Sequence, residues 1–488
     1  MLARVGPTEQ AARRRRRLDS ACQILILAAL TWGVLSFGAV YPWAYWPLLV
    51  ACWIVALLVV AASPPAAGTG ASLGILAAAL AMVAATVLIQ VVPLHARLLA
   101  RISPHTVDFL SVYDLQYASS SGVMTGPSHP LSILPRATWR GLAFFSSLAA
   151  LFLATASLLS RTTPSRLAGS LVGLATAIAL TGIIQKSMVA EKIYGFWTPQ
   201  YPGSPFGPFV NRNHFAGWML MAWPLAFGYL CAVIARGAGD RGGGWRQALL
   251  WFSSPDANRL VLVATAVFAM AASLVMTASR SGAASFLVVL ILMSWFVVRA
   301  QGRISRKLIA AAYLLLLGFT IVGWVGITAL QRRLDEPALP GLGRRGVWQD
   351  TLAIVRDFPM TGTGLNTYGT AMVRYQTVEV VEYHYAEAHN DYLQLAAEGG
   401  LLVGIPSLIV LGAFVLTVGR RFKQGADDSE TYWLRAGAVG ALVGIACQEV
   451  VDFSLQMPGN AALFAVVAAI AVHRSSFAMQ GPKLNRSI

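Results

Sequence analysis

Arginines and histidines occur in four short stretches between residues 211 and 394, and their chemistry suits a phosphorylated sugar. The stretches are NRNHFAG at 211–217, SRSG at 279–282, GRRGVW at 343–348 and HNDYLQ at 389–394. A guanidinium is permanently charged and binds phosphate oxygens in a bidentate manner. An imidazole can accept a proton near neutral pH. Together, these groups could hold a diphosphate leaving group and activate a sugar hydroxyl.

The arginines of these stretches also have simpler interpretations. Arg280 could extend from a short turn between two helices toward the membrane surface, as long basic side chains often do. Arg212 and His214 could serve only at a helix start, for which we expect Asn213 to be the N-cap. These interpretations explain each residue alone, but not the convergence of several arginines and histidines on one face.

The histidines and acids have alternatives of the same kind. His389 could be an interfacial histidine whose hydrogen bonds are satisfied by the loop backbone. We expect Glu449 and Asp452 to pair with arginine at a helix contact rather than to act in catalysis. The acids of EVVEYHYAEAHND could form only a solvated face.

Other catalytic chemistries have no matching motif. The sequence has no HExxH, no phosphate-binding Walker loop, no GxSxG and no DxD-type acidic cluster. The glycines of GTGLNTYG are interpreted as turn and cap residues. We therefore expect neither a metal nor a cofactor.

The elements that position these residues are predicted to be membrane helices. The chain has 488 residues, of which 56% are hydrophobic and 12% charged, and its apolar runs are long enough to cross a ~30 Å hydrocarbon core. We therefore expect an all-α polytopic protein. The twelve expected spans are 21–40, 44–62, 72–92, 138–159, 167–186, 214–235, 260–278, 282–298, 308–330, 401–419, 433–453 and 459–473.

The charge distribution predicts the orientation of these spans. With the amino terminus inside, the segments on the inner side carry 23 Lys and Arg but seven Asp and Glu, whereas the rest of the chain carries 14 of each. The net charge of +16 thus lies on one side, as the positive-inside rule requires. We infer a multi-pass protein with both termini in the cytoplasm, basic segments that contact membrane lipids, and no nucleic-acid partner.

The longest outer segment is expected to be a helical loop. The stretch GRRGVWQDTLAIVRDFP has apolar residues at helical spacing, LNTYGTAMVRYQTV is compatible with a second helix, and HNDYLQLAAEGG with a third that ends at Gly399 and Gly400. The expected regions are a basic cytoplasmic segment 1–20, nine spans in 21–330, the outer helical loop 331–400, three spans in 401–473 and a cytoplasmic tail 474–488.

The chain resembles the superfamily of O-antigen ligases and of O-antigen and exopolysaccharide polymerases, over about residues 200–410. The resemblance rests on NRNHFAG, SRSG, GRRGVWQDTLAIVRDFPMTGTGLNTYG and HNDYLQLAAEGGLLVG in this order. It implies a GT-C-type fold in the bacterial inner membrane. It also implies metal-independent, inverting transfer of a glycan from an undecaprenyl diphosphate donor on the periplasmic face. The acceptor would be lipid A–core for a ligase or a growing polysaccharide for a polymerase.

The resemblance also suggests a role for each candidate residue. His389 matches the loop histidine expected to act as general base. The residues expected to bind the diphosphate are Arg280, Arg345, Arg344 and Arg212. The residues expected to position substrates are Asn390, Tyr392, His214 and His384. Which of the histidines at 384 and 389 reacts is left open by the sequence.

Three other functions remain open. The ligase pattern that follows the His-Asn pair is matched at Gly400 but not at Val403, so a polymerase stays an alternative to a ligase. Twelve helices with both ends inside also suit a solute transporter, which would concentrate polar residues at the membrane midplane. A non-catalytic assembly or flippase partner of the same pathway is the remaining alternative.

Overall fold

The computed structural model describes most of the chain. The described ranges are 7–62, 70–120, 128–188, 192–199, 204–238, 255–300, 344–377, 384–423 and 428–474. Within them the chain forms helices and isolated bridges, with no strand. The expected ninth span, 308–330, lies outside the described residues.

Nine of the described helices are long and apolar enough to cross a membrane. They are α1 (Pro7–Leu35), α2 (Pro42–Ala62), α3 (Gly70–Val91), α7 (Pro135–Leu159), α8 (Pro164–Met188), α9 (Arg212–Ala238), α11 (Pro255–Met276), α12 (Arg280–Ala300) and α16 (Asp391–Lys423). Two further helices, α17 (Ser429–Gln448) and the shorter apolar α18 (Pro458–Val472), lie where the last two spans were expected. Helix α1 already begins at Pro7, so the run of arginines from Arg13 is helical.

The bundle is packed most closely around α9 and α17. Gly228 of α9 and Gly437 of α17 lie where the two backbones meet. A Cβ at Gly228 would lie 2.4 Å from the Trp433 carbonyl oxygen, and one at Gly437 would lie 2.5 Å from the Pro224 carbonyl oxygen. Small residues at such a crossing let two helices approach without a gap. This close contact holds α9 and α17 against each other along their length, and Gln448 Nε2 at the end of α17 donates to the Asn213 carbonyl at the start of α9.

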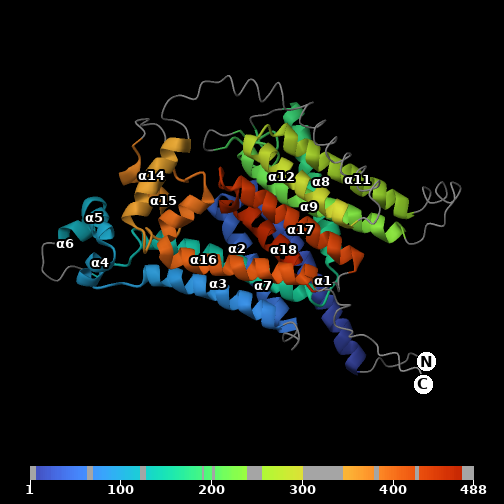
Figure 1. The fold of residues 1–488 in the computed structure, drawn as a ribbon, viewed down its shortest axis with the longest axis horizontal. Coiled ribbons are helices and arrows are strands. Elements are labelled where there is room, and N and C mark those ends of the chain that lie inside the picture. The colour runs from blue at the N-terminus through green and yellow to red at the C-terminus, as the bar shows by residue number, and fades with distance from the viewer. Residues whose placement is uncertain are drawn as a thin grey trace.

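Shorter helices gather at the other end of the bundle from the start of α1, as Figure 1 shows. They are α4 (Ala96–Ile102), α5 (Pro104–Tyr113), α6 (Leu115–Ser120), α14 (Arg344–Asp357) and α15 (Tyr368–Tyr375). An apolar core of their own joins α5, α14, α15 and the start of α16. Its buried members include Phe109, Ile354, Phe358, Met372 and Ala397. The outer segments therefore form a packed cap, and α14 and α15 occupy the first two stretches for which helices were predicted.

The third predicted cap helix is continuous with the next span. Helix α16 runs from Asp391 to Lys423 and is broken at Gly400, where φ is 53° and ψ is −157°. Gly399, expected to end the helix together with Gly400, is not part of this break. The first nine residues of α16 belong to the cap, and the rest crosses the membrane region. The break at Gly400 thus sets the angle between the cap and the bundle.

Candidate active site

His389 lies in a short, rigid turn at the start of α16. Its backbone adopts a positive φ of 51°, an unusual conformation for a residue other than glycine. The preceding residue, Ala388, is fixed on both sides: its carbonyl accepts a hydrogen bond from Trp348 Nε1 at 3.1 Å, and its N–H donates to Gln394 Oε1 at 2.9 Å. Such over-determined backbone strain is typical of functional sites. The turn therefore fixes the position of the imidazole.

The His389 ring packs against Phe453, with the ring centroids 4.7 Å apart and the planes at 82°. His214 packs against the same phenyl ring, at 4.9 Å and 77°. The Nδ1 atom of His389 and the Nε2 atom of His214 are buried without a hydrogen-bond partner among the described residues. The interpretation that the loop backbone satisfies His389 is therefore wrong for its Nδ1 atom.

His389 is uncharged at neutral pH. Burial, and to a smaller extent the nearby Arg344 guanidinium, lowers the pKa of its imidazole to about 4. A neutral imidazole is the form that can accept a proton. An anion bound beside it would favour the charged form and raise this pKa. The site therefore holds a proton acceptor whose basicity would increase with an anion bound beside it.

Asp452 joins three separate elements close to this histidine. Its carboxylate is fully buried and lies 3.7 Å from Arg344 Nη2, at the start of α14. Its Oδ2 atom accepts a hydrogen bond of 3.1 Å from Ser281 Oγ, in the first turn of α12, and its Oδ1 atom accepts one of 3.0 Å from the Phe453 N–H. The expectation that Asp452 pairs with an arginine is thus confirmed, although the arginine belongs to the cap.

The four candidate arginines differ in burial and in whether they contact Asp452. Arg280 is exposed, begins α12 and immediately precedes Ser281, whose hydroxyl donates to this carboxylate. Arg344 is in contact with the carboxylate and keeps 41% of its side chain exposed. Arg345 is exposed on the first turn of α14. Arg212 is half-buried at the start of α9, and its N–H donates to the Ser204 carbonyl at 2.7 Å.

The N-cap expected at Asn213 lies two residues earlier, at Asn211. Helix α9 begins at Arg212, and Asn211 is the cap, because its Oδ1 atom accepts a hydrogen bond from the Asn213 N–H at 2.9 Å. Asn213 instead turns toward the rest of the site: its carbonyl accepts from Gln448 Nε2, and its side chain bonds to Asp452. The helix start of α9 is therefore tied to the same carboxylate as α12 and α14.

Three residues predicted to position substrates already have structural partners or lie apart. Asn390 caps α16, since its Oδ1 atom accepts a hydrogen bond from the Leu393 N–H at 3.0 Å. The Tyr392 hydroxyl donates to the Ala446 carbonyl at 2.8 Å. His384 is exposed, and its neighbour Tyr385 donates its N–H to Gln376. Of the two histidines in this stretch, His389 is the one in the packed site.

Glycines in the PMTGTG turn let the cap backbone pack directly against the backbone of α16. Gly362 has a φ of 62°, and a Cβ there would lie 2.1 Å from the Glu398 carbonyl oxygen. Glu398 itself is buried, and its carboxylate accepts hydrogen bonds from the Asn366 and Tyr368 N–H groups. Gln90, at the end of α3, donates to the Thr361 and Glu398 carbonyls. These contacts agree with the interpretation of the glycines as turn residues.

Sequence reasoning missed the polar network beneath the histidine. Gln394 Nε2 donates to Glu387 Oε2 at 2.6 Å and to Gln456 Oε1 at 3.1 Å, and Gln456 Nε2 donates to Asp391 Oδ1 at 2.7 Å. Burial, together with Asp391, raises the pKa of Glu449 well above its ordinary value. The available signal was the concentration of Glu449, Asp452 and Gln456 immediately before the last apolar run.

The site thus combines a fixed, neutral imidazole with a buried carboxylate that Arg344 contacts, and Arg280 and Arg345 lie exposed at the starts of two helices of the site. Among the described residues, no group of three or more His, Cys, Asp or Glu side chains is arranged to hold a metal ion. The exposed guanidinium groups can bind phosphate oxygens, and the imidazole can accept a proton.

One comparison with known proteins identifies a family. Residues 265–408 match the family model Wzy_C, described as O-antigen ligase. The match begins in α11 and ends within α16, and it includes Arg280, Arg344, Arg345 and His389. No curated protein matches the chain significantly.

Proposed function

We propose that this chain, in which residues 265–408 match the O-antigen ligase family model, transfers a glycan from undecaprenyl diphosphate to a sugar hydroxyl. We propose that the acceptor is lipid A–core, which makes the protein a ligase of the inner membrane with its site on the periplasmic face. The single observation that carries this proposal is the convergence of α12, α14 and the His389 turn on Asp452 and Phe453.

The donor diphosphate is bound by the exposed guanidinium groups. Arg280 and Arg345 contact the phosphate oxygens, and Arg344 adds a third positive charge beside Asp452. Asp452 acts as a positioning residue, because it holds the turn that presents Arg280 and the helix start that presents Arg344. Placing fixed positive charge where the leaving group develops negative charge is commonly the largest contribution to catalysis.

His389 accepts the proton of the attacking hydroxyl. The acceptor oxygen forms a bond to the anomeric carbon while the bond from that carbon to the diphosphate oxygen breaks. The proton passes to the imidazole, and the electron pair of the broken bond leaves with undecaprenyl diphosphate. A single displacement of this kind inverts the anomeric configuration. The protein itself supplies every group in the step, which is why we propose metal-independent transfer.

The test uses full-length protein in vesicles with a lipid-linked diphosphate oligosaccharide and EDTA. One arm adds lipid A–core as acceptor, and the other offers only further donor molecules. Transfer to lipid A–core is the expected result. Chains that lengthen from donor alone would make the protein a polymerase instead. Binding of the lipid diphosphate without either product would overturn the enzyme proposal in favour of a transport or assembly role.

A further inference from the structure

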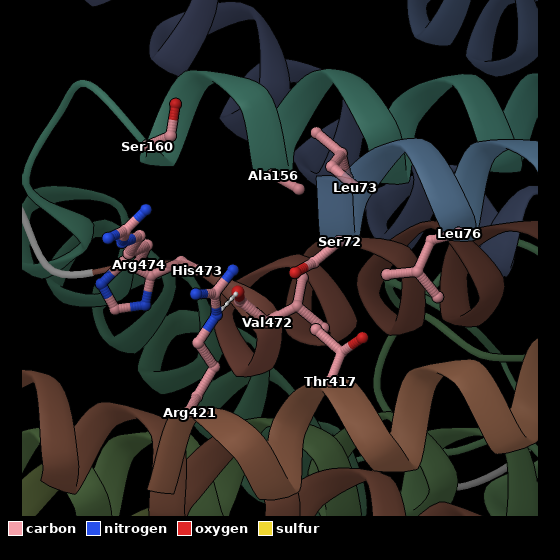
Figure 2. A pocket seen from close by; sticks show the side chains of 10 residues that line it. All are labelled: Ser72, Leu73, Leu76, Ala156, Ser160, Thr417, Arg421, Val472, His473 and Arg474. Carbon is pink, nitrogen blue, oxygen red and sulfur yellow. Dashed lines mark hydrogen bonds between the residues drawn. The ribbon is translucent and has the colours of Figure 1, made fainter. Parts of the chain in front are cut away.

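A second set of basic side chains lies at the opposite end of the bundle from the candidate active site. They line a cavity of about 30 Å³ between the inner ends of α3, α7, α16 and α18. Figure 2 shows Arg421, His473 and Arg474 on one side of this cavity, Ser72 facing them, and Leu73 and Leu76 beyond Ser72. The positive-inside distribution assigns this end to the cytoplasm.

The basic side chains of this cavity are held by backbone contacts. Arg421 Nε donates to the Val472 carbonyl at 3.2 Å, which leaves its guanidinium directed toward Ser72 (Figure 2). His473 is 3% exposed, and its Nε2 atom has no hydrogen-bond partner in the described part of the chain. The described residues that line the cavity include no acid. A buried imidazole edge beside two guanidinium groups and a hydroxyl is a set of donors suited to a phosphate group.

Other charges around His473 come from α17. Asp428 caps that helix by accepting the Thr431 N–H at 2.9 Å, and Arg435 donates to the Ala471 carbonyl at 2.7 Å. Burial and the charges of Arg435 and Arg421 lower the pKa of His473 to about 4, whereas Asp428 opposes this shift. The charged groups that act on His473 are thus two arginines and one acid.

An apolar chamber lies next to the basic cavity. It has a volume of about 470 Å³, within the ~300–1,000 Å³ typical of small-molecule sites. Leu76 lines both spaces, and α3, α7, α16 and α18 supply walls to both. The chamber also includes Leu80, Phe145, Phe152, Phe414, Leu455 and Phe464. A small basic cavity and a larger apolar chamber thus lie side by side at Leu76.

We propose that this cleft binds an anionic phospholipid of the cytoplasmic leaflet, with its phosphate at Arg421, His473 and Arg474 and an acyl chain in the chamber. Free phosphate would leave the adjoining apolar chamber unexplained. A polyprenyl tail entering from the outer site would fill the chamber but leave the basic cavity unused. An anionic phospholipid fits both parts, because its phosphate would lie in the basic cavity at the cytoplasmic end and its acyl chain would extend into the chamber.

The binding test titrates the full-length protein in detergent with phosphatidylglycerol and follows the complexes by native mass spectrometry. We expect phosphatidylglycerol to bind more tightly than phosphatidylcholine. We expect the double substitution Arg421→Gln and Arg474→Gln to weaken binding about 25-fold, since each arginine near anionic lipid contributes about 5-fold. Arg420→Gln is the matched control, because Arg420 is exposed on the same turn and does not line the cavity. It should bind like the wild type.

A second variant tests the chamber without changing any charge. Ala149 lines the chamber and is half-buried, so Ala149→Phe fills the space while leaving both arginines in place. It should reduce phosphatidylglycerol binding by an amount comparable to the double substitution. Equal binding by all these variants would overturn the proposal. So would competition by inorganic phosphate as strong as that of the lipid, or displacement of phosphatidylglycerol by undecaprenyl diphosphate alone.

Discussion

Arginines at the two ends of the bundle have acidic partners, but they use them differently. At the inner end, Arg161 Nε lies 3.0 Å from Asp19 Oδ1, both side chains are 11% exposed, and a second bond reaches the Val59 carbonyl. At the outer end, Arg344 lies 3.7 Å from a fully buried Asp452 while 41% of its own side chain stays exposed. The inner pair closes a contact between helices. The outer pair orients a guanidinium that still faces solvent, which is the arrangement a charged substrate needs.

Removing the proton acceptor at the outer end should cause the largest loss of transfer rate. We expect His389→Ala to reduce the transfer rate about 10²–10⁴-fold, the usual contribution of a general base. His384→Ala should retain nearly wild-type transfer, because His384 is exposed and outside the packed site. The measurement is product formed per protein in vesicles at matched expression. Loss of transfer in the His384 variant with a normal rate in the His389 variant would reverse the assignment.

The next largest effect, on thermal stability, concerns the turn where the cap packs against α16. Gly362→Ala places a Cβ 2.1 Å from the Glu398 carbonyl oxygen at a φ of 62°. The left-handed backbone alone costs about 1–2 kcal/mol for a residue with a Cβ, and the steric clash adds to this. Gly404→Ala is the control, since its Cβ would meet nothing within 4 Å inside α16. Thermal unfolding in detergent should show a clear loss for Gly362→Ala alone. Equal melting temperatures would contradict the described turn.

A smaller loss of activity is expected when an exposed arginine of the candidate site is replaced. Arg280→Gln should lower kcat/KM about 10–100-fold, because a hydrogen bond to a charged group contributes about 1.5–3 kcal/mol. Arg356→Gln removes the same charge from an exposed position in the last turn of α14 and should leave kcat/KM unchanged. Identical values for the two variants would mean that Arg280 acts only through general surface charge.

The pH dependence should be the mildest effect near neutral pH. His389 has a pKa of about 4 in place of its ordinary 6.5, so its neutral form persists well below pH 6.5. We expect kcat/KM, which reports the free enzyme, to stay level from pH 7 to about 5 and to fall as pH drops through about 4. A fall centred near pH 6.5 would show that the buried imidazole environment is described wrongly.

The same shift also predicts a dependence of stability on pH. Between pH 6.5 and about 4 the unfolded chain binds more protons at His389 than the folded chain does. The contribution of this residue to the free energy of unfolding is therefore present above pH 6.5 and lost as pH falls toward 4. His389→Ala should remove this part of the acid sensitivity, as followed by thermal unfolding at several pH values.

Local sequence patterns predicted the elements of the cap well. The apolar spacing after Arg344 and the proline at 359 predicted α14, and the glycines before Leu401 predicted the break in α16. What these patterns could not predict is pairing across the chain. Ser281 and Asp452 meet across 171 positions, and Gln90 reaches Glu398 across 308. Such contacts depend on how the helices pack, which periodicity within one element does not encode.

The most direct test of the central claim is the anomeric configuration of the bond that the protein makes. Full-length protein in vesicles with EDTA would convert a donor of known configuration, and NMR of the isolated product would compare the two. Direct attack by a hydroxyl activated by His389 predicts inversion. Retention would require a covalent glycosyl intermediate and would contradict the proposed step.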